Sequence, residues 1–156
     1  MTIVRHAGCN SLVEDIVHIQ RFCRDGAGNL RAENTFLVPA EYADMPRLGL
    51  LGTMNRWFDS AGYVGMGPFE TYRERDAAAV LGRYRQKAAE LGGNYLMPQS
   101  SGNRTRVRRL TLGSGKTALT FIPDAPMEFS LEAHSDAELF AARHRHELSE
   151  STRWYL

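Results

Sequence analysis

The chain has 156 residues, of which 43% are apolar, 24% charged and 10% aromatic. This length suits one domain, and the composition excludes a disordered, collagenous or disulfide-dense chain. The 19 basic and 18 acidic residues give a formal net charge of +1, so no global field would draw the molecule to nucleic acid or an anionic membrane. We therefore expect a single domain over residues 1–156, with residues 1–10 and 151–156 as termini that contact other molecules.

The start of the chain gives no sign of export. No run of about 18 apolar residues that could span a bilayer occurs, and the first six residues are too short and polar for a signal peptide. The chain is therefore expected to be cytoplasmic or already processed. Residues 7–11 (Ala-Gly-Cys-Asn-Ser) look like the end of a bacterial lipoprotein cleavage box that lacks its apolar segment. Cys9 and Cys23 could be bridged, free or lipidated, and two idle or buried thiols are favoured.

The first third of the chain gives mixed signals. In residues 11–24, a capping box at Ser11 and Glu14 favours a helix, whereas the β-branched residues before a glycine-rich turn favour a hairpin; both alternatives stay open. Residues 34–38 and 48–54 are predicted strands. Residues 59–68 contain three glycines and are expected to form a mobile loop.

Residues 70–91 carry the strongest helical pattern. Apolar residues recur at steps of three and four with arginines between them, Thr71 and Glu74 form a capping box, and a Gly-Gly-Asn sequence follows. We therefore predict an amphipathic helix here, followed by a short strand at 95–97.

The rest of the chain predicts strands and a second helix. Residues 107–112 and 117–122 flank Gly-Ser-Gly-Lys, which resembles the tail of a phosphate-binding loop; Leu110 replaces its first glycine and a β-branched segment follows, so a hairpin turn is favoured. Residues 127–133 alternate as a strand, and a capping box at Ser135 and Glu138 opens a helix to about residue 148. Together these elements predict an α+β fold, a two-layer sandwich of a mostly antiparallel sheet with two main helices.

The titratable residues show no recognised catalytic or metal-binding pattern. His144 and His146 are two apart on the predicted helix, so they would point to different faces, and His134 could join them only through the fold. The residues His6, Cys9, His18 and Cys23 lack paired metal-ligand spacing, and no nucleophile motif occurs. The sequence therefore predicts no catalytic residue, no metal ligand and no cofactor.

Two groups of residues are candidates for partner binding. Five basic residues and no acid lie between positions 99 and 123, and strand alternation would place Arg104, Arg106 and Arg108 on one face beside Arg109. A solvated stripe, partly neutralised by Glu128 and Glu132, is favoured over an anionic partner because no aromatic residues interleave with the arginines. Trp154 and Tyr155 lie next to the last residue, Leu156, and would either dock on a partner or fold back on their own sheet.

One segment resembles a known family. Pro46-Arg47-Leu48-Gly49, a strand and loop, and a capped helix that ends in Ala-Ala-Glu-Leu-Gly-Gly-Asn-Tyr-Leu-Met-Pro resemble small bacterial envelope lipoproteins related to the Rcs outer-membrane stress sensor, over about residues 45–98. The resemblance implies a non-enzymatic sensing, scaffolding or assembly role, with a periplasmic location or one on the periplasmic face of the outer membrane.

The sequence therefore favours a non-enzymatic interaction domain, a component of a larger bacterial or phage assembly. Its contact residues would be Arg104, Arg106, Arg108, Arg109, Trp154 and Tyr155, and its partner a protein or a second copy. One alternative is a small-molecule-binding protein or enzyme with a pocket under the Gly62–Gly67 loop, using His134 or His146. Another is an anion or nucleic-acid binder that uses the arginines from 104 to 109.

Overall fold

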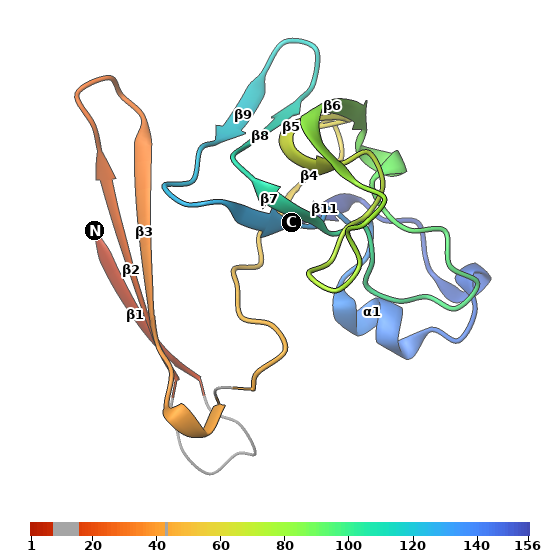
Figure 1. Ribbon diagram of the computed structural model, residues 1–156, viewed down its shortest axis with the longest axis horizontal. Coiled ribbons are helices and arrows are strands. Elements are labelled where there is room, and N and C mark those ends of the chain that lie inside the picture. The colour runs from red at the N-terminus through yellow and green to blue at the C-terminus, as the bar shows by residue number, and fades with distance from the viewer. Residues whose placement is uncertain (8–15, 43) are drawn as a thin grey trace. The chain divides into compact units, whose positions relative to one another are not determined.

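A computed structural model describes residues 1–7, 16–42 and 44–156 of the protein, and these residues fall into two compact units, Met1–Gly49 and Leu50–Leu156 (Figure 1). The prediction of one domain over 1–156 stays a prediction. The predicted α+β sandwich with two main helices is wrong: in the described ranges the chain is mostly antiparallel strand and has a single α-helix, α1 (Asp136–Ala141). No helix in these ranges is both long and apolar enough for a membrane span.

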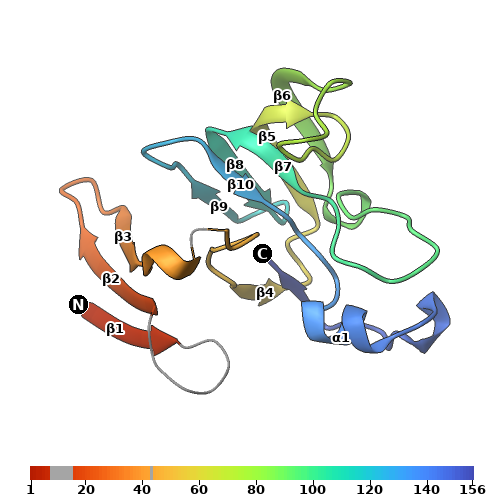
Figure 2. The ribbon, with the colours of Figure 1, turned by 60° about the horizontal axis from the view of Figure 1, so that its bottom comes forward.

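The first unit is a three-stranded antiparallel sheet in the order β1 (Thr2–Ala7), β2 (Ile16–Arg24) and β3 (Leu30–Leu37), followed by the 3-10 turn η1 (Ala40–Tyr42) (Figure 2). Asp25 starts the β2–β3 turn, where its Oδ1 accepts hydrogen bonds from the backbone N–H groups of Ala27 at 2.9 Å and Asn29 at 2.8 Å. The β-branched run therefore forms a hairpin from Ile16 onward. Ser11, Glu14 and Cys9 lie outside the described residues.

The second unit is built around a four-stranded antiparallel sheet in the order β6-β5-β8-β9. Its strands are β5 (Ser60–Gly67), β6 (Val80–Lys87), β8 (Arg109–Gly113) and β9 (Ala118–Phe121). Two smaller antiparallel pairs join β7 (Arg104–Val107) to β10 (Met127–Phe129), and β4 (Thr53–Asn55) to β11 (Arg153–Tyr155). The core residues, several of which lie on β5 and β8, are Ala61, Tyr63, Ala88, Leu91, Val107, Leu110, Leu112, Phe129, Leu131 and Trp154.

The hairpin of β8 and β9 confirms the sequence prediction. Leu110 pairs with Phe121 and Leu112 with Leu119, and the backbone N–H of Ser114 donates to the carbonyl of Thr117 at 2.9 Å. The sequence Gly-Ser-Gly-Lys therefore turns the chain between two strands.

The helix predicted for residues 70–91 does not form. The chain instead makes tight turns, then β6, then the 3-10 turn η2 (Ala88–Glu90). Along β6 the partly buried Gly82, Tyr84 and Gln86 alternate with exposed neighbours, which is the period of a strand. The intervening arginines fit both this alternation and the polar face of a helix, so the sequence pattern did not distinguish the two. Val80 and Leu81, which the helix would have buried, are 67% and 55% exposed. No strand forms at 95–97 either, and the strand predicted at 48–54 is reduced to β4.

The mobile loop predicted for residues 59–68 is the central strand β5, which pairs with both β6 and β8. Two of its glycines, Gly65 and Gly67, leave no room for a Cβ atom. A Cβ atom at Gly65 would lie 2.9 Å from the Val107 side chain, so glycine is needed where β7 packs against this strand. The loop that was predicted to cover a pocket at Gly62–Gly67 therefore does not exist.

The second predicted helix begins where expected but is short. Ser135 accepts a hydrogen bond from the Glu138 backbone, and Glu138 bonds back to Ser135, which is the predicted capping box. The helix ends at Ala141 because Ala142 is extended, with φ −82° and ψ 131°. Residues 144 and 146 therefore lie beyond the helix, and the 3-10 turn η3 (Arg145–Glu147) follows.

Arg104 is buried, with 2% of its surface exposed. Its guanidinium donates to the Tyr63 hydroxyl at 3.0 Å and to the carbonyls of Gly102 at 2.9 Å and Pro68 at 3.2 Å. Arg106 has a φ of +54° and sits where the register between β7 and β10 shifts. Such a bulge breaks strand alternation, so Arg104 faces inward while Arg106 faces solvent, and the predicted one-sided arginine stripe does not form.

We expect Arg104→Ala to lower the free energy of unfolding by about 3 kcal/mol, because it removes the donor to the buried Gly102 carbonyl and the buried Tyr63 hydroxyl. Tryptophan fluorescence in urea measures this directly, since Trp57 and Trp154 both lie in the second unit. Arg109→Ala, at an exposed position of the neighbouring strand, is the matched control and should change stability by no more than about 0.5 kcal/mol. Equal losses in the two variants would contradict the structural role assigned to Arg104.

Candidate functional site around Trp154

The second unit contains a cavity of about 440 Å³ with a mixed polar and apolar lining, here called the Trp154 pocket. It is bordered by the chain after β6, by the segment after β10 and by β11. Its polar and aromatic lining residues are Arg56, Glu90, Asn94, Tyr95, Gln99, Ser101, Glu132, His134, Arg145 and Trp154.

Strand pairing fixes Trp154 in this pocket. Trp154 pairs with Met54 of β4, and the neighbouring Tyr155 exchanges two backbone hydrogen bonds with Glu132, at 2.9 and 2.8 Å. The indole is 4% exposed. The end of the chain thus folds back on its own unit, one of the two alternatives open for Trp154 and Tyr155.

Two residues that line the pocket each carry a buried N–H group that has no hydrogen-bond partner in the described part of the chain. The guanidinium carbon of Arg56 lies 3.6 Å from the ring centroid of Trp154, a cation–π contact. Nη1 of Arg56 and Nε1 of Trp154 are both buried, and neither has a hydrogen-bond partner among the described residues. Leaving a buried donor unpaired costs about 1–3 kcal/mol. A hydroxyl or water oxygen that reached these atoms would relieve that cost.

Glu132 contributes a buried carboxyl. Its Oε1 accepts hydrogen bonds from the backbone N–H of Ser101 at 3.1 Å and from the Ser101 hydroxyl at 2.6 Å. Burial raises the pKa of the Glu132 carboxyl above its ordinary value, and the Ser101 donors offset only part of this effect. Close by in sequence, the ring of His134 bonds the carbonyl of Ser149 at 2.9 Å.

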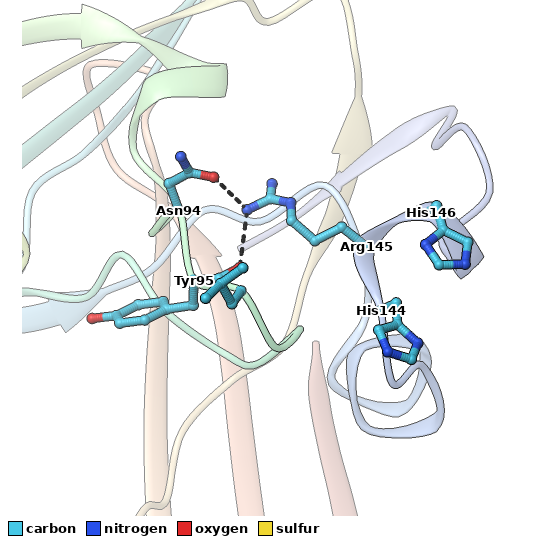
Figure 3. A pocket seen from close by; sticks show the side chains of 6 residues that line it. Asn94, Tyr95, His144, Arg145 and His146 are labelled. Carbon is cyan, nitrogen blue, oxygen red and sulfur yellow. Dashed lines mark hydrogen bonds between the residues drawn. The ribbon is translucent and has the colours of Figure 1, made fainter.

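A second cavity of about 520 Å³, here called the His144 pocket, shares Asn94, Tyr95 and Arg145 with the Trp154 pocket. Arg145 donates to Asn94 Oδ1 at 2.8 Å and to the Tyr95 carbonyl at 3.4 Å. Figure 3 shows Arg145 extended toward this loop, while His144 and His146 point away from it (Figure 3). Arg145 therefore lines both cavities.

The structure separates the residues that the sequence had grouped. Arg104 is internal, Arg106 is paired with Asp76 at 3.3 Å, and Arg108 and Arg109 are exposed. Binding of a partner by these arginines, Trp154 and Tyr155 stays a prediction. His134 and His146 do line cavities, but different ones. Sequence reasoning missed Arg56, Ser101 and Glu132 as site residues because only long-range strand pairing brings them together.

The lining of the Trp154 pocket suits a small polyhydroxylated ligand. Amide, guanidinium and imidazole groups and a carboxyl offer both donors and acceptors, and aromatic rings provide apolar surface. A few convergent polar groups in a concave site are typical of small-molecule binding.

We expect Glu132→Gln to alter how stability depends on pH. A raised pKa means that the folded chain binds the proton more tightly than the unfolded chain, so ionisation makes folding less favourable as pH rises from about 4.5 through the folded pKa. The free energy of unfolding of the variant minus that of the original chain should therefore be larger at pH 7 than at pH 4. Urea titrations at both pH values measure this difference. The exposed Glu150→Gln is the control; a pH-independent difference for Glu132→Gln would contradict the effect of burial.

Comparison with known proteins places the chain in an enzyme family. The family model described as "Beta galactosidase small chain" matches residues 8–156. A β-galactosidase of Priestia megaterium is 32% identical over 125 residues, covering 80% of this chain and 12% of that enzyme. The β-galactosidase of Streptococcus thermophilus is 34% identical over 110 residues, covering 69% and 11%, and that of Vibrio cholerae 31% over 120 residues, covering 77% and 11%. The chain thus spans about an eighth of the length of these relatives.

These matches overturn two predictions. The resemblance of residues 45–98 to Rcs-related lipoproteins is wrong: the helix that carried it is β6 and η2, and the relatives are β-galactosidases. The predicted non-enzymatic interaction, scaffolding or sensing domain of a bacterial or phage assembly is also wrong, because the family and the relatives are those of an enzyme. The alternatives of a pocket under a loop at 62–67 and an anion- or nucleic-acid-binding stripe at 104–109 fail on the structure, since residues 60–67 form strand β5 and Arg104 is buried. The chain belongs to the β-galactosidase small-chain family.

Proposed function

We propose that this chain works as one domain of a β-galactosidase, an enzyme that hydrolyses β-galactosides, and that the Trp154 pocket lines its sugar-binding region. The match of the family model to residues 8–156 carries this proposal. The relatives are about eight times longer than the region they share with this chain, so most of the enzyme lies outside the matched region.

The catalytic carboxylates are proposed to come from that larger part. Glycosidases generally place two carboxyl groups on either side of the scissile bond. The two acids that line the Trp154 pocket are both engaged in local structure: Glu132 with Ser101, and Glu90 with the backbone N–H and the ammonium group of Lys87. These contacts support a positioning role for the domain.

The pocket offers unused hydrogen-bond donors to a sugar. Both N–H groups, on Arg56 and Trp154, are buried, so the hydroxyl oxygens of a sugar would reach them after the side chain of Arg56 moves. Arg56 covers one face of the indole, so the indole would contribute its N–H rather than an open stacking face. Asn94 and Gln99 supply amide groups at the rim, where both are exposed.

Association with the remaining enzyme is proposed to use exposed apolar side chains near the pockets. Leu96 is 97% exposed, Met97 66% and Phe140 94%, values that are costly for large apolar residues left in water. Leu96 lines the His144 pocket and Met97 the Trp154 pocket. The exposed Arg106, Arg108 and Arg109 remain candidate contact residues for the same association.

The two tryptophans provide an internal control for sugar binding. In a ¹⁵N–¹H spectrum, titration with methyl β-galactoside should shift the indole signal of Trp154, whose N–H lacks a partner, and leave that of Trp57 unmoved, because Trp57 is 66% exposed and does not line the pocket. Trp57→Phe assigns the two signals. We expect the chain alone to leave nitrophenyl β-galactoside unhydrolysed.

Two results would contradict the proposal. The first is an indole signal of Trp154 that stays fixed, or that moves equally with glycerol, at all sugar concentrations. The second is hydrolysis by the chain alone that Glu132→Gln abolishes, which would make Glu132 a catalytic residue.

A further inference from the structure

Three potential metal ligands meet just beyond the end of α1. His144, His146 and Glu147 each bring one ligand atom to within 4.8 Å of the other two, and all three side chains are exposed. In the described part of the chain, no other group of three His, Cys, Asp or Glu residues comes so close together.

The α-helix ends before the two histidines, and their rings lie side by side. His144 is extended, with φ −135° and ψ 150°, and the 3-10 turn η3 begins at Arg145. The two imidazole rings stack with centroids 5.3 Å apart and planes inclined by 17°. The predicted helix, which would have separated them, had ended at Ala141.

Glu147 completes the group and orients it. Its Oε1 lies 2.8 Å from Nδ1 of His144, and its Oε2 accepts the backbone N–H of Arg143 at 2.8 Å. These hydrogen bonds lower the pKa of the Glu147 carboxyl. A carboxylate that holds one ring nitrogen of a histidine is the usual arrangement behind a metal-binding imidazole, because it fixes the ring and leaves the other nitrogen available.

We propose that His144, His146 and Glu147 form a binding site for a divalent transition-metal ion of the zinc, nickel or copper class. Imidazole and carboxylate ligands suit these ions, whereas Mg²⁺ and Ca²⁺ prefer oxygen ligands alone. Glu147 acts either as the third ligand or as the group that orients His144.

Small side-chain rotations would close the site. A tetrahedral ion with bonds of about 2.0–2.1 Å needs ligand atoms about 3.3 Å apart, less than the present span of 4.8 Å. Exposed side chains change rotamer without disturbing a core. Water would fill the remaining positions.

A bound ion would restrict the motion of Arg145, which lines both pockets. Arg145 lies between the two histidines in sequence and holds the loop at Asn94 and Tyr95. Tying the residues on either side of Arg145 to one ion would restrict the backbone from which its guanidinium reaches this loop.

Calorimetric titration with ZnCl₂ tests the site, using the 156-residue chain without a histidine tag and with Cys9→Ser and Cys23→Ser, so that thiols cannot bind the metal. We expect one equivalent of Zn²⁺ to bind and MgCl₂ to give no binding heat. His144→Ala and His146→Ala should each weaken Zn²⁺ binding by about tenfold or more, since even the loss of an orienting group behind a ligand costs about 10–100-fold. His6→Ala, an exposed histidine on β1, is the matched control and should leave the affinity unchanged.

A second measurement reports the ligands themselves. On addition of Zn²⁺, the imidazole signals of His144 and His146 should shift together in a ¹⁵N–¹H spectrum, while those of His6 stay fixed. Either absence of a saturable equivalent, or equal affinity in the His144→Ala and His6→Ala chains, would overturn the proposal. Loss of the fold does not blur the result, because the altered side chains are exposed and circular dichroism verifies each variant.

Discussion

The buried guanidinium of Arg104 is the constraint on which the second unit depends. It joins the Tyr63 hydroxyl on β5 to the carbonyls of Pro68 and Gly102, so it ties the central strand to two loops that have no regular structure of their own. Gly102, with its φ of +70°, directly follows Ser101, the residue that holds Glu132. Arg104 thus helps to position the Glu132 carboxyl in the Trp154 pocket, because it holds the backbone at Gly102 next to the Ser101 that binds Glu132.

Local signals in the sequence were sufficient for some elements. The β8–β9 hairpin needed only alternation on both sides of a glycine-rich turn, and the start of α1 needed only its capping box. The segment from Glu70 to Leu91 failed because the same residues satisfied a helical and a strand period, and the pairing of β6 with β5 decided between them. The glycines of β5 failed for a related reason: close packing on β7 and high mobility use the same residue type, and only the three-dimensional contact distinguishes them.

The candidate site was less accessible to sequence reasoning than the fold. Trp154 could be singled out by its residue type, but its neighbours come from positions 56, 94, 101 and 132, and no spacing rule connects them. For His144 and His146 the difficulty was different, because the two residues were noticed in the sequence but were assigned to a helix. A helix to about residue 148 would point the two rings to different faces, whereas α1 ends at Ala141 and the rings lie side by side. Family membership, in turn, supplied the enzyme class, which none of these local patterns contained.

The three-stranded sheet of the first unit has its own consequence. Its order places β1 and β3 on the outside, so each presents one row of backbone amides and carbonyls that the sheet itself does not use, the template onto which foreign strands add in aggregation. Arg5 on β1 and Arg31 and Glu33 on β3 are exposed along these borders, and charge there discourages indiscriminate strand addition. Charged side chains on both outer strands therefore make it less favourable for unrelated strands to add to this sheet.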